Sequence, residues 1–265
     1  MIRDWIAKSL SLLMQRTSRS GFGHGLKREL GVRVSFCTFL ILTYYPDREP
    51  VSQYSWIGDP KLLKTYHSQY LSGAYRLDPY YQMAMRPFRP GFFRLRDIAP
   101  DRFYTSEYYH RYYAQTRLCD EVGVLVRQSD GSVSAISSSR DERGGPFSRS
   151  EVNGWRAIAP VITELLRQHA EKIHVSSAAT KQTGGPDTAK LILNFSKRLL
   201  PKGLTRREAE ISALILEGHS NLSISGHLNI ATDTVKVHRR NIYRKLQISS
   251  QAELFPKLHA ALISR

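Results

Sequence analysis

The chain has 265 residues, of which 41% are hydrophobic and 10% aromatic, and a formal net charge of +16. The length exceeds that of one typical domain and the apolar content excludes a disordered chain, so we expect two folded domains. The positive charge favours a polyanionic partner, either nucleic acid or an anionic membrane surface. It is spread along the chain, with 28 Lys and Arg against 18 Asp and Glu before residue 198 and 11 against 5 from there on, so charge does not locate the binding site.

Residue types that hold metals or perform catalysis are few and scattered. Cys37 and Cys119 form no C-x-x-C pattern, which argues against a disulfide framework or a zinc site. The nine histidines show no spacing typical of a triad or a metal centre. The first 20 residues place apolar side chains at helical spacing, but the run is short and includes Lys8, so it predicts an amphipathic helix that packs on the domain or on a dimer partner. We expect a cytoplasmic protein with no catalytic site, cofactor, metal ion or membrane partner.

The part of the chain before residue 175 combines strand and helix signals. Val32–Tyr45 is rich in β-branched and aromatic residues, which predicts a strand or a bent pair of strands, and two later runs joined by an Asp-Gly pair predict a β-hairpin. The helix after them has Ser148 at its N-cap and Glu151 three residues on, the capping-box spacing. We expect an α+β sensor-like domain over residues 1–175, an antiparallel sheet flanked by helices. The hairpin strands are predicted at 121–128 and 131–138, and the helices at 60–73, 78–86, 105–116 and 148–170.

Small and polar residues separate this region from the C-terminal part. Ser, Thr, Gly and Pro are frequent from about residue 174 to residue 190, and apolar periodicity is absent there. We interpret residues 176–198 as an interdomain linker and residues 199–265 as a second, all-α domain.

The second domain has the helix signals of a helix-turn-helix. Thr205 and Glu208 stand at capping-box positions and open a helix that stops at Gly218, and Ser220 can cap a short helix that follows. The second and third helices are predicted at Asn221–Leu228 and Thr232–Leu246.

The third of these helices has two distinct faces. At about 100° per residue, Val235, Ile242 and Leu246 share one arc, which we expect to face the core. The opposite arc consists of Lys236, Val237, Arg240 and Arg244. Lys and Arg can donate to guanine acceptors and an apolar side chain can contact a thymine methyl, so this face suits the major groove of duplex DNA. A charged face that only meets solvent is the alternative.

The motifs of this region resemble the LuxR-type DNA-binding module. They are LTRRE at Leu204–Glu208, GHSN at Gly218–Asn221, TVKVH at Thr234–His238 and NIYRKL at Asn241–Leu246. The resemblance covers about a quarter of the chain and implies a four-helix module that binds double-stranded DNA. It implies that Lys236, Val237 and Arg240 face base edges, and that phosphates are held by Ser220, Asn221, Thr234, Arg239 and Lys245.

Three positions depart from the usual pattern of that module. Ser223 replaces an acidic residue, Ala231-Thr232 replaces Ser-Pro, so that the N-cap is expected to shift to Thr232, and Pro256 lies in the fourth helix. The family commonly dimerises through that helix, and we expect a homodimer, with RNA polymerase as a candidate partner. The apolar stripe that motivates the dimer is Leu254, Phe255, Leu258 and Leu262.

Tyrosines and one aspartate in the first domain suggest how the module is controlled. Neither the acidic pair of a phosphoreceiver domain nor an ATP-binding Gly-Lys-Thr/Ser loop is present. Aromatic residues around a single carboxylate would make a small-molecule pocket with one charged anchor, whereas the alternative is ordinary core with Asp78 as the N-cap of the next helix. The candidate ligand-binding residues are Tyr66, Tyr70, Tyr75, Asp78 and Phe93.

The order of these residues is similar to the autoinducer-binding domain of quorum-sensing regulators. Tyr66 and Phe93 stand where that family has two Trp, and Asp78 matches the family's Asp. The resemblance implies a ligand of the acyl-homoserine-lactone type. A phenyl ring does not supply the indole N–H donor, so a ligand of another class is the alternative.

The sequence therefore predicts a DNA-binding transcription regulator controlled by a small ligand in its N-terminal domain. One alternative is a ligand-independent regulator whose N-terminal domain serves only dimerisation or protein contacts. A sigma-factor region-4-like module would require an upstream aromatic and basic promoter-melting helix, which we do not find. An enzyme with a DNA-tethering tail is the rival from another class.

Overall fold

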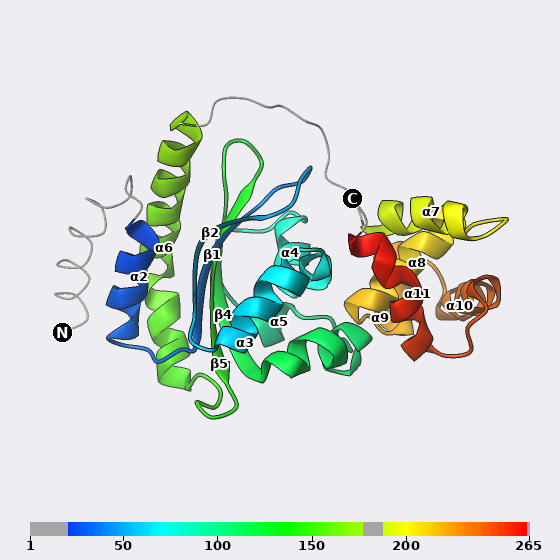
Figure 1. Ribbon diagram of the computed structural model, residues 1–265, viewed down its shortest axis with the longest axis horizontal. Helices are drawn as coiled ribbons and strands as arrows, with labels where there is room; N and C mark the ends of the chain where they lie inside the picture. The colour runs from blue at the N-terminus through cyan, green and yellow to red at the C-terminus, as the bar shows by residue number, and fades with distance from the viewer. Residues whose placement is uncertain (1–20, 177–187, 264–265) are drawn as a thin grey trace. The chain divides into compact units, whose positions relative to one another are not determined.

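The computed structural model describes residues 21–176 and 188–263, so the amphipathic helix predicted for the first 20 residues lies outside the described residues. The chain divides into two compact units (Figure 1). The second unit consists of residues 65–82, 99–116 and the chain from residue 186 onward, and the other described residues make up the first. The domain boundaries at residues 175 and 199 stay a prediction.

A five-stranded antiparallel sheet organises the first unit. Its strand order is β2-β1-β5-β4-β3, and each neighbouring pair is antiparallel. The predicted hairpin is confirmed, and Gly131 in its turn has a φ of 84°, which a residue with a side chain rarely adopts. The strands are β1 (Thr38–Tyr44), β2 (Val51–Ile57), β3 (Gly91–Arg94), β4 (Leu118–Arg127) and β5 (Val133–Asp141).

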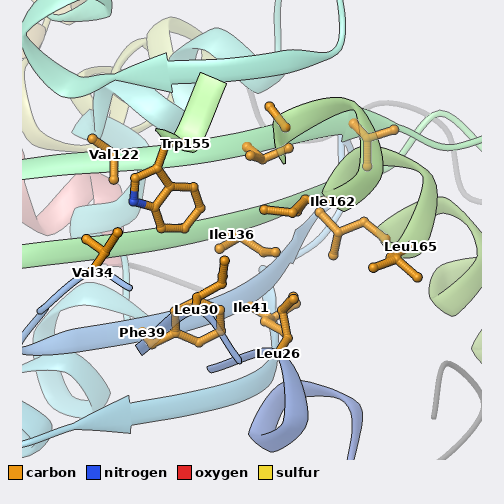
Figure 2. Close-up of a cluster of buried hydrophobic side chains, with 14 of the residues drawn as sticks. Leu26, Leu30, Val34, Phe39, Ile41, Val122, Ile136, Trp155, Ile162 and Leu165 are labelled. Carbon is orange, nitrogen blue, oxygen red and sulfur yellow. The ribbon is translucent and has the colours of Figure 1, made fainter. Parts of the chain in front are cut away.

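Two helices, α2 (Phe22–Gly31) and α6 (Arg149–Ser176), cover one face of this sheet (Figure 1). Because side chains alternate along a strand, every second residue of β1, β4 and β5 points to this face. Figure 2 shows Trp155 of α6 near Val122 and Ile136 of the sheet. The ring of Trp155 is 1% exposed, and burial of such a side chain contributes roughly 2–3 kcal/mol. This hydrophobic core covers one face of the sheet. The opposite face carries a different set of side chains.

The capping box predicted for the long helix is confirmed. Glu151 N–H donates to Ser148 Oγ at 3.3 Å, and Ser148 N–H donates to Glu151 Oε2 at 2.8 Å. Burial alone would raise the pKa of Glu151, but hydrogen bonds from Ser148 and Arg140 outweigh it and hold this pKa below its ordinary value. The helix continues past the predicted end at residue 170, to Ser176.

Two short edge strands, β2 and β3, were not predicted from the sequence. β2 is half-exposed along most of its length and β3 has four residues, so neither shows a strong apolar pattern. The strand predicted over Val32–Tyr45 begins later, at Thr38, because the chain turns after α2. The other short elements of the N-terminal region are α3 (Pro60–Thr65), the π-helix η1 (Tyr66–Tyr70), η2 (Ala74–Leu77), α4 (Pro79–Ala84), α5 (Leu95–Ile98), η3 (Phe103–Thr105), the π-helix η4 (Tyr109–Tyr113) and η5 (Ala114–Thr116).

The C-terminal part of the second unit is all helical, as predicted. Part of the segment interpreted as a linker, residues 188–198, belongs to helix α7. No helix among the described residues has both the length and the apolar character needed to cross a membrane. The helices are α7 (Thr188–Leu199), α8 (Arg206–Glu217), α9 (Asn221–Leu228), α10 (Thr232–Leu246) and α11 (Gln251–Ile263).

Candidate functional site

Hydrogen bonds at the helix ends hold the helix-turn-helix in shape. Glu208 N–H donates to Thr205 Oγ1 at 3.2 Å and Thr205 N–H donates to Glu208 Oε2 at 2.7 Å, which confirms the capping box of α8. Gly218 ends α8 with a φ of 98°, in the left-handed region that favours glycine. Ser220 then caps α9, since its Oγ accepts from Ser223 N–H at 3.1 Å. These local signals produce the tight joint between α8 and α9.

A buried ion pair joins α8 to α10. Lys245 Nζ lies 2.7 Å from Glu208 Oε2, and the Glu208 side chain is 4% exposed. Burial alone would raise the pKa of Glu208, but hydrogen bonds from Lys245 and Thr205 outweigh it and lower this pKa. Lys245 was predicted to hold a phosphate; its side chain is 27% exposed and its ammonium pairs with Glu208, so the phosphate role stays a prediction.

The two faces of α10 are as the sequence indicates. Val235, Ile242 and Leu246 are at most 1% exposed, so they pack into the core of the second unit. The N-cap is Ala231 without a side-chain bond, so the shift of the N-cap to Thr232 was wrong; the hydroxyl of Thr232 instead donates to Ser225 Oγ at 3.3 Å. The exposed side chains of the opposite face are Lys236, Val237, Arg240 and Arg244.

Two of the exposed cationic side chains of α10 contact residues of the same helix. Lys236 Nζ lies 2.8 Å from Asp233 Oδ1, and Arg244 Nη2 donates to Asn241 Oδ1 at 3.0 Å, both on the surface of the same helix. Exposed pairs of this kind contribute little to stability, at most about 1 kcal/mol. The two side chains can therefore exchange these contacts for others at small cost.

Arg239 connects three elements of the second unit. Its guanidinium donates to Asn221 Oδ1 at 2.7 Å, to Tyr243 Oη at 2.9 Å and to Gln251 Oε1 at 3.0 Å, so it ties α10 to α9 and α11. Of the other residues predicted to hold phosphates, Ser220 and Asn221 are half-buried at the start of α9, and Thr234 is exposed in the first turn of α10. Arg239 therefore orients Asn221, and both terminal nitrogens of its guanidinium are engaged in hydrogen bonds to other side chains of the protein.

The apolar stripe of α11 is part of the protomer's own core. Leu254 and Leu258 are fully buried and Phe255 is 7% exposed, and α11 packs against α7 and α8. The sequence could not assign this stripe correctly, because α7 was taken as linker. The fourth residue, Leu262, is outside the part of the structure in which side chains are described. The stripe therefore does not supply the dimer surface inferred from it, and the homodimer stays a prediction without it.

Four of the five candidate ligand residues come together in the second unit. Tyr70 stacks on Tyr66 with ring centroids 5.5 Å apart and meets Tyr75 edge-on at 6.3 Å. Tyr70 Oη donates to Asp78 Oδ2 at 2.6 Å, and Tyr80 N–H donates to Asp78 Oδ1 at 2.8 Å. The second bond makes Asp78 the cap of α4, which confirms the predicted cap and leaves the ligand role of Asp78 a prediction. Phe93, the fifth candidate, lies on β3 in the first unit, where its ring is 6.0 Å from that of Phe88.

Burial raises the pKa of Asp78 to about 6, although the hydrogen bonds from Tyr70 and Tyr80 act to lower it. A carboxyl whose pKa is higher in the folded than in the unfolded chain favours folding below its unfolded pKa, and that contribution is lost as the pH rises through 6. We expect Asp78→Asn to destabilise the protein more at pH 4.5 than at pH 7.5. Two full pKa units would correspond to roughly 3 kcal/mol, and since Asp78 keeps some solvent exposure we expect about half of that. Urea unfolding of both proteins at the two pH values measures this difference.

The matched control for that experiment is Asp59→Asn. Asp59 also accepts a backbone hydrogen bond at a helix start, from Lys61 N–H at 2.8 Å, but it is exposed. Asp59→Asn therefore measures what the loss of an exposed capping carboxylate does by itself at the two pH values. An equal cost of Asp78→Asn at pH 4.5 and pH 7.5 would show that burial does not perturb Asp78.

Two sets of buried side chains were not identified from the sequence, one of stacked tyrosines and one of polar residues on the sheet. Tyr112 stacks on Tyr70 at 6.0 Å and on Tyr108 at 5.5 Å, and the repeated tyrosines four residues apart are the signal that could have found them. On the sheet face opposite α2 and α6, Ser137 Oγ donates to Glu121, which is 8% exposed. On the same face Thr38 is 2% exposed, and its Oγ1 has no hydrogen-bond partner among the described residues. We call Thr38, Glu121 and Ser137 the buried polar row. Pairing between β1, β5 and β4 brings these residues to one face of the sheet, and the sequence alone carries no signal for that pairing.

The C-terminal helices of this chain match a known protein family. Residues 202–257 match the model of "Bacterial regulatory proteins, luxR family". The chain is 30% identical to the HTH-type transcriptional regulator in the exeN 3'region of Aeromonas salmonicida, over 67% of this chain and 91% of that protein. It is 27% identical to the "Monoamine regulon transcriptional regulator" of Klebsiella aerogenes, over 71% of this chain and 70% of that protein.

A solved structure accounts for the N-terminal region. The LBD domain of VqsR from Pseudomonas aeruginosa is 26% identical, with a TM-score of 0.53, and the match covers 63% of this chain and 96% of that domain. The α+β fold class, with an antiparallel sheet and helices ahead of a helix-turn-helix, is thereby confirmed. Together with the capped helices and the exposed cationic face of α10, these matches show that the chain belongs to the luxR family of bacterial regulatory proteins and is a helix-turn-helix transcriptional regulator.

Proposed function

We propose that this regulator binds specific sequences of duplex DNA through α10 and that a small organic ligand in its N-terminal region controls the binding. One observation carries the DNA part: α10 buries Val235 and Ile242 completely and exposes Lys236 and Arg240 on the opposite side. A helix supported in this way can enter the major groove without losing its packing.

Within that helix the side chains divide by role. Lys236 and Arg240 donate to base edges, Val237 contacts a thymine methyl, and Arg244 continues the cationic face. Ser220, Asn221 and Thr234 hold phosphates, which sets the register of the helix on the duplex. Arg239 positions Asn221 through the 2.7 Å hydrogen bond between them.

The ligand part rests on the cluster of Asp78 with Tyr66, Tyr70 and Tyr75. Each carboxylate oxygen of Asp78 accepts one protein hydrogen bond and has a second lone pair to offer. A ligand that brings an N–H or O–H donor would offset the cost of burying this carboxylate. A protonated amine fits best, because tyrosine ring faces also attract cations, and a relative carries the name of a monoamine regulon.

Ligand-induced stabilisation tests this assignment. We expect phenethylamine, as a monoamine probe, to raise the melting temperature of the wild-type protein, and N-octanoyl homoserine lactone to do so less. Asp78→Asn keeps the helix cap, so the free variant should melt nearly as the wild type does, while the shift with phenethylamine should fall by at least half.

Every other outcome of these melting-temperature measurements would contradict one part of the proposal. Equal shifts in wild type and Asp78→Asn would leave Asp78 as a helix cap only. A larger shift with the lactone would replace the amine by an autoinducer of the acyl-homoserine-lactone type. No shift with either probe would favour the ligand-independent regulator whose N-terminal domain serves dimerisation or protein contacts.

The proposal includes a homodimer on DNA and contact with RNA polymerase. Two copies of α10 related by a two-fold axis would recognise a pseudo-palindromic site with half-site centres about 34 Å apart. Because Leu254, Phe255 and Leu258 of the α11 stripe are buried within the protomer, we place the dimer surface outside these three residues. The mass of the protein on its selected DNA site tests this stoichiometry, and a monomeric mass would contradict it.

A further inference from the structure

A segment from the N-terminal half of the chain is hydrogen-bonded to the joint between α8 and α9. Arg102 N–H donates to the Gly218 carbonyl oxygen at 3.0 Å, and Ser220 N–H donates to Asp101 Oδ1 at 3.0 Å. Both bonds lie within the second unit. We call the segment Pro100–Ser106 the docked loop.

The docked loop approaches the joint closely as well as bonding to it. A Cβ added at Gly218 would lie 2.9 Å from Phe103 Cα, closer than real Cβ atoms come to backbone, and 3.2 Å from Ser106 Cβ, which is a tight contact. Gly218 therefore serves both the left-handed end of α8 and this approach. Phe103 is fully buried, so the contact is packed.

The charge of Asp101 suits its position at the start of α9. Burial alone would raise the pKa of Asp101, but hydrogen bonds from Ser220 and the charge of His219 outweigh it and lower this pKa. The carboxylate is thus ionised at neutral pH, and an anion is favoured at a helix N-terminus. A DNA phosphate at Ser220 and Asn221 would use the same Ser220 N–H group and the same end of the helix dipole.

A row of aromatic rings connects the docked loop to the Asp78 cluster. Phe103 lies 6.0 Å from Tyr108, Tyr108 stacks on Tyr112 at 5.5 Å, and Tyr112 stacks on Tyr70 at 6.0 Å. Tyr70 in turn donates to Asp78. Because packed rings leave little free volume, movement of Tyr70 requires the rings along this row to adjust.

We propose that the docked loop is an autoinhibitory contact: Asp101 occupies the position of a DNA phosphate at the start of α9, and the loop must leave Ser220 before DNA can bind there. The inference rests on the proposed binding of DNA by this module. Because the row of aromatic rings connects the docked loop to the candidate ligand residues, a ligand bound there controls whether the loop stays docked.

The test compares DNA affinities of the full chain, without ligand, for a duplex that the wild type selects from a random pool. Asp101→Ala is expected to bind about five- to tenfold more tightly than wild type, since loss of the carboxylate frees the Ser220 amide. Glu49→Ala is the charge-matched control, because Glu49 is exposed in a turn of the first unit. Its affinity should stay within about twofold of wild type, which measures the general effect of removing one negative charge.

Hydrogen exchange at the Ser220 amide supplies a second measurement that does not depend on DNA. The amide should exchange slowly in the wild type and faster in Asp101→Ala, with Glu49→Ala unchanged. Equal affinity gains in the two variants, or rapid exchange of this amide in the wild type, would overturn the autoinhibitory contact. If the wild type selects no DNA sequence, the proposed function fails, while the exchange result still decides whether the loop is docked.

Discussion

Simultaneous replacement of Lys236 and Arg240 by alanine is expected to remove most of the sequence preference of this regulator. Both side chains are exposed on α10, and the opposite face of that helix, with Val235 and Ile242, is fully buried. Each base-edge contact is worth about 1–3 kcal/mol, so the double variant should lose roughly 2–6 kcal/mol of specific binding if the contacts are independent. The helix should remain folded, because neither side chain contributes to the core.

Titration of the single and double variants against the selected duplex and a scrambled duplex measures this loss. Each single variant should relax the preference at one position per half-site, while binding to the scrambled duplex falls by much less. Arg206→Ala is the control, since Arg206 on α8 carries the same charge, is 88% exposed and pairs with Glu210 at 3.1 Å on the surface of the same helix. Losses of equal size for Arg206→Ala and Arg240→Ala would show that α10 contributes charge alone.

The helix-turn-helix could be predicted from the sequence because its signals are local. The capping box of Thr205 and Glu208, the left-handed Gly218 and the cap at Ser220 each act within one helical turn. The 3.6-residue period then assigned Val235 and Ile242 to the core. For the same reason the β-hairpin of β4 and β5, closed by its own turn, was predicted within a few residues.

Features that depend on distant parts of the chain could not be predicted. The order of the five strands follows from pairings such as Thr38 with Ser139, about a hundred residues apart. The α11 stripe looked like a dimer surface because the helix that covers part of it, α7, lies in a segment with few strong signals. The contact of Asp101 with Ser220 has no sequence signature at all, since an aspartate that follows a proline is ordinary turn chemistry.

The environment of Asp78 depends both on local sequence signals and on contacts with other parts of the chain. Its place before Pro79 predicted a helix cap, and the 2.8 Å bond from Tyr80 N–H is that cap. The stacking of Tyr66 on Tyr70 follows from their spacing of four residues within η1, whereas the bond from Tyr70 Oη to Asp78 depends on how the chain turns between η1 and α4. A sequence pattern of aromatic spacing is compatible with both core and pocket, so the ligand role needs the solution experiment above.

A buried carboxylate holds the far edge of the sheet in the first unit. Asp120 on β4 is 3% exposed and forms an ion pair with Arg94 of β3. It also accepts from Phe147 N–H at 2.9 Å and from Glu121 N–H at 3.1 Å. One side chain thus joins β3, β4 and the chain entering α6, and it stands beside Glu121 of the buried polar row.

Asp120→Ala is accordingly expected to destabilise the first unit by about 3–5 kcal/mol, because the buried amide of Phe147 would lose its acceptor and the largely buried guanidinium of Arg94 would lose its charge partner, while it keeps the Phe147 carbonyl oxygen at 3.2 Å. In a unit of this size that corresponds to a fall in melting temperature on the order of 10 °C. Tryptophan fluorescence can follow it, since Trp56 and Trp155 both lie in the first unit. Asp97→Ala is the control: Asp97 lies 3.9 Å from Arg156 with both side chains more than half exposed, so its loss should cost less than about 1 kcal/mol. A cost of Asp120→Ala no larger than that of Asp97→Ala would mean that packing of α6, rather than this ion pair, fixes the edge strand β3.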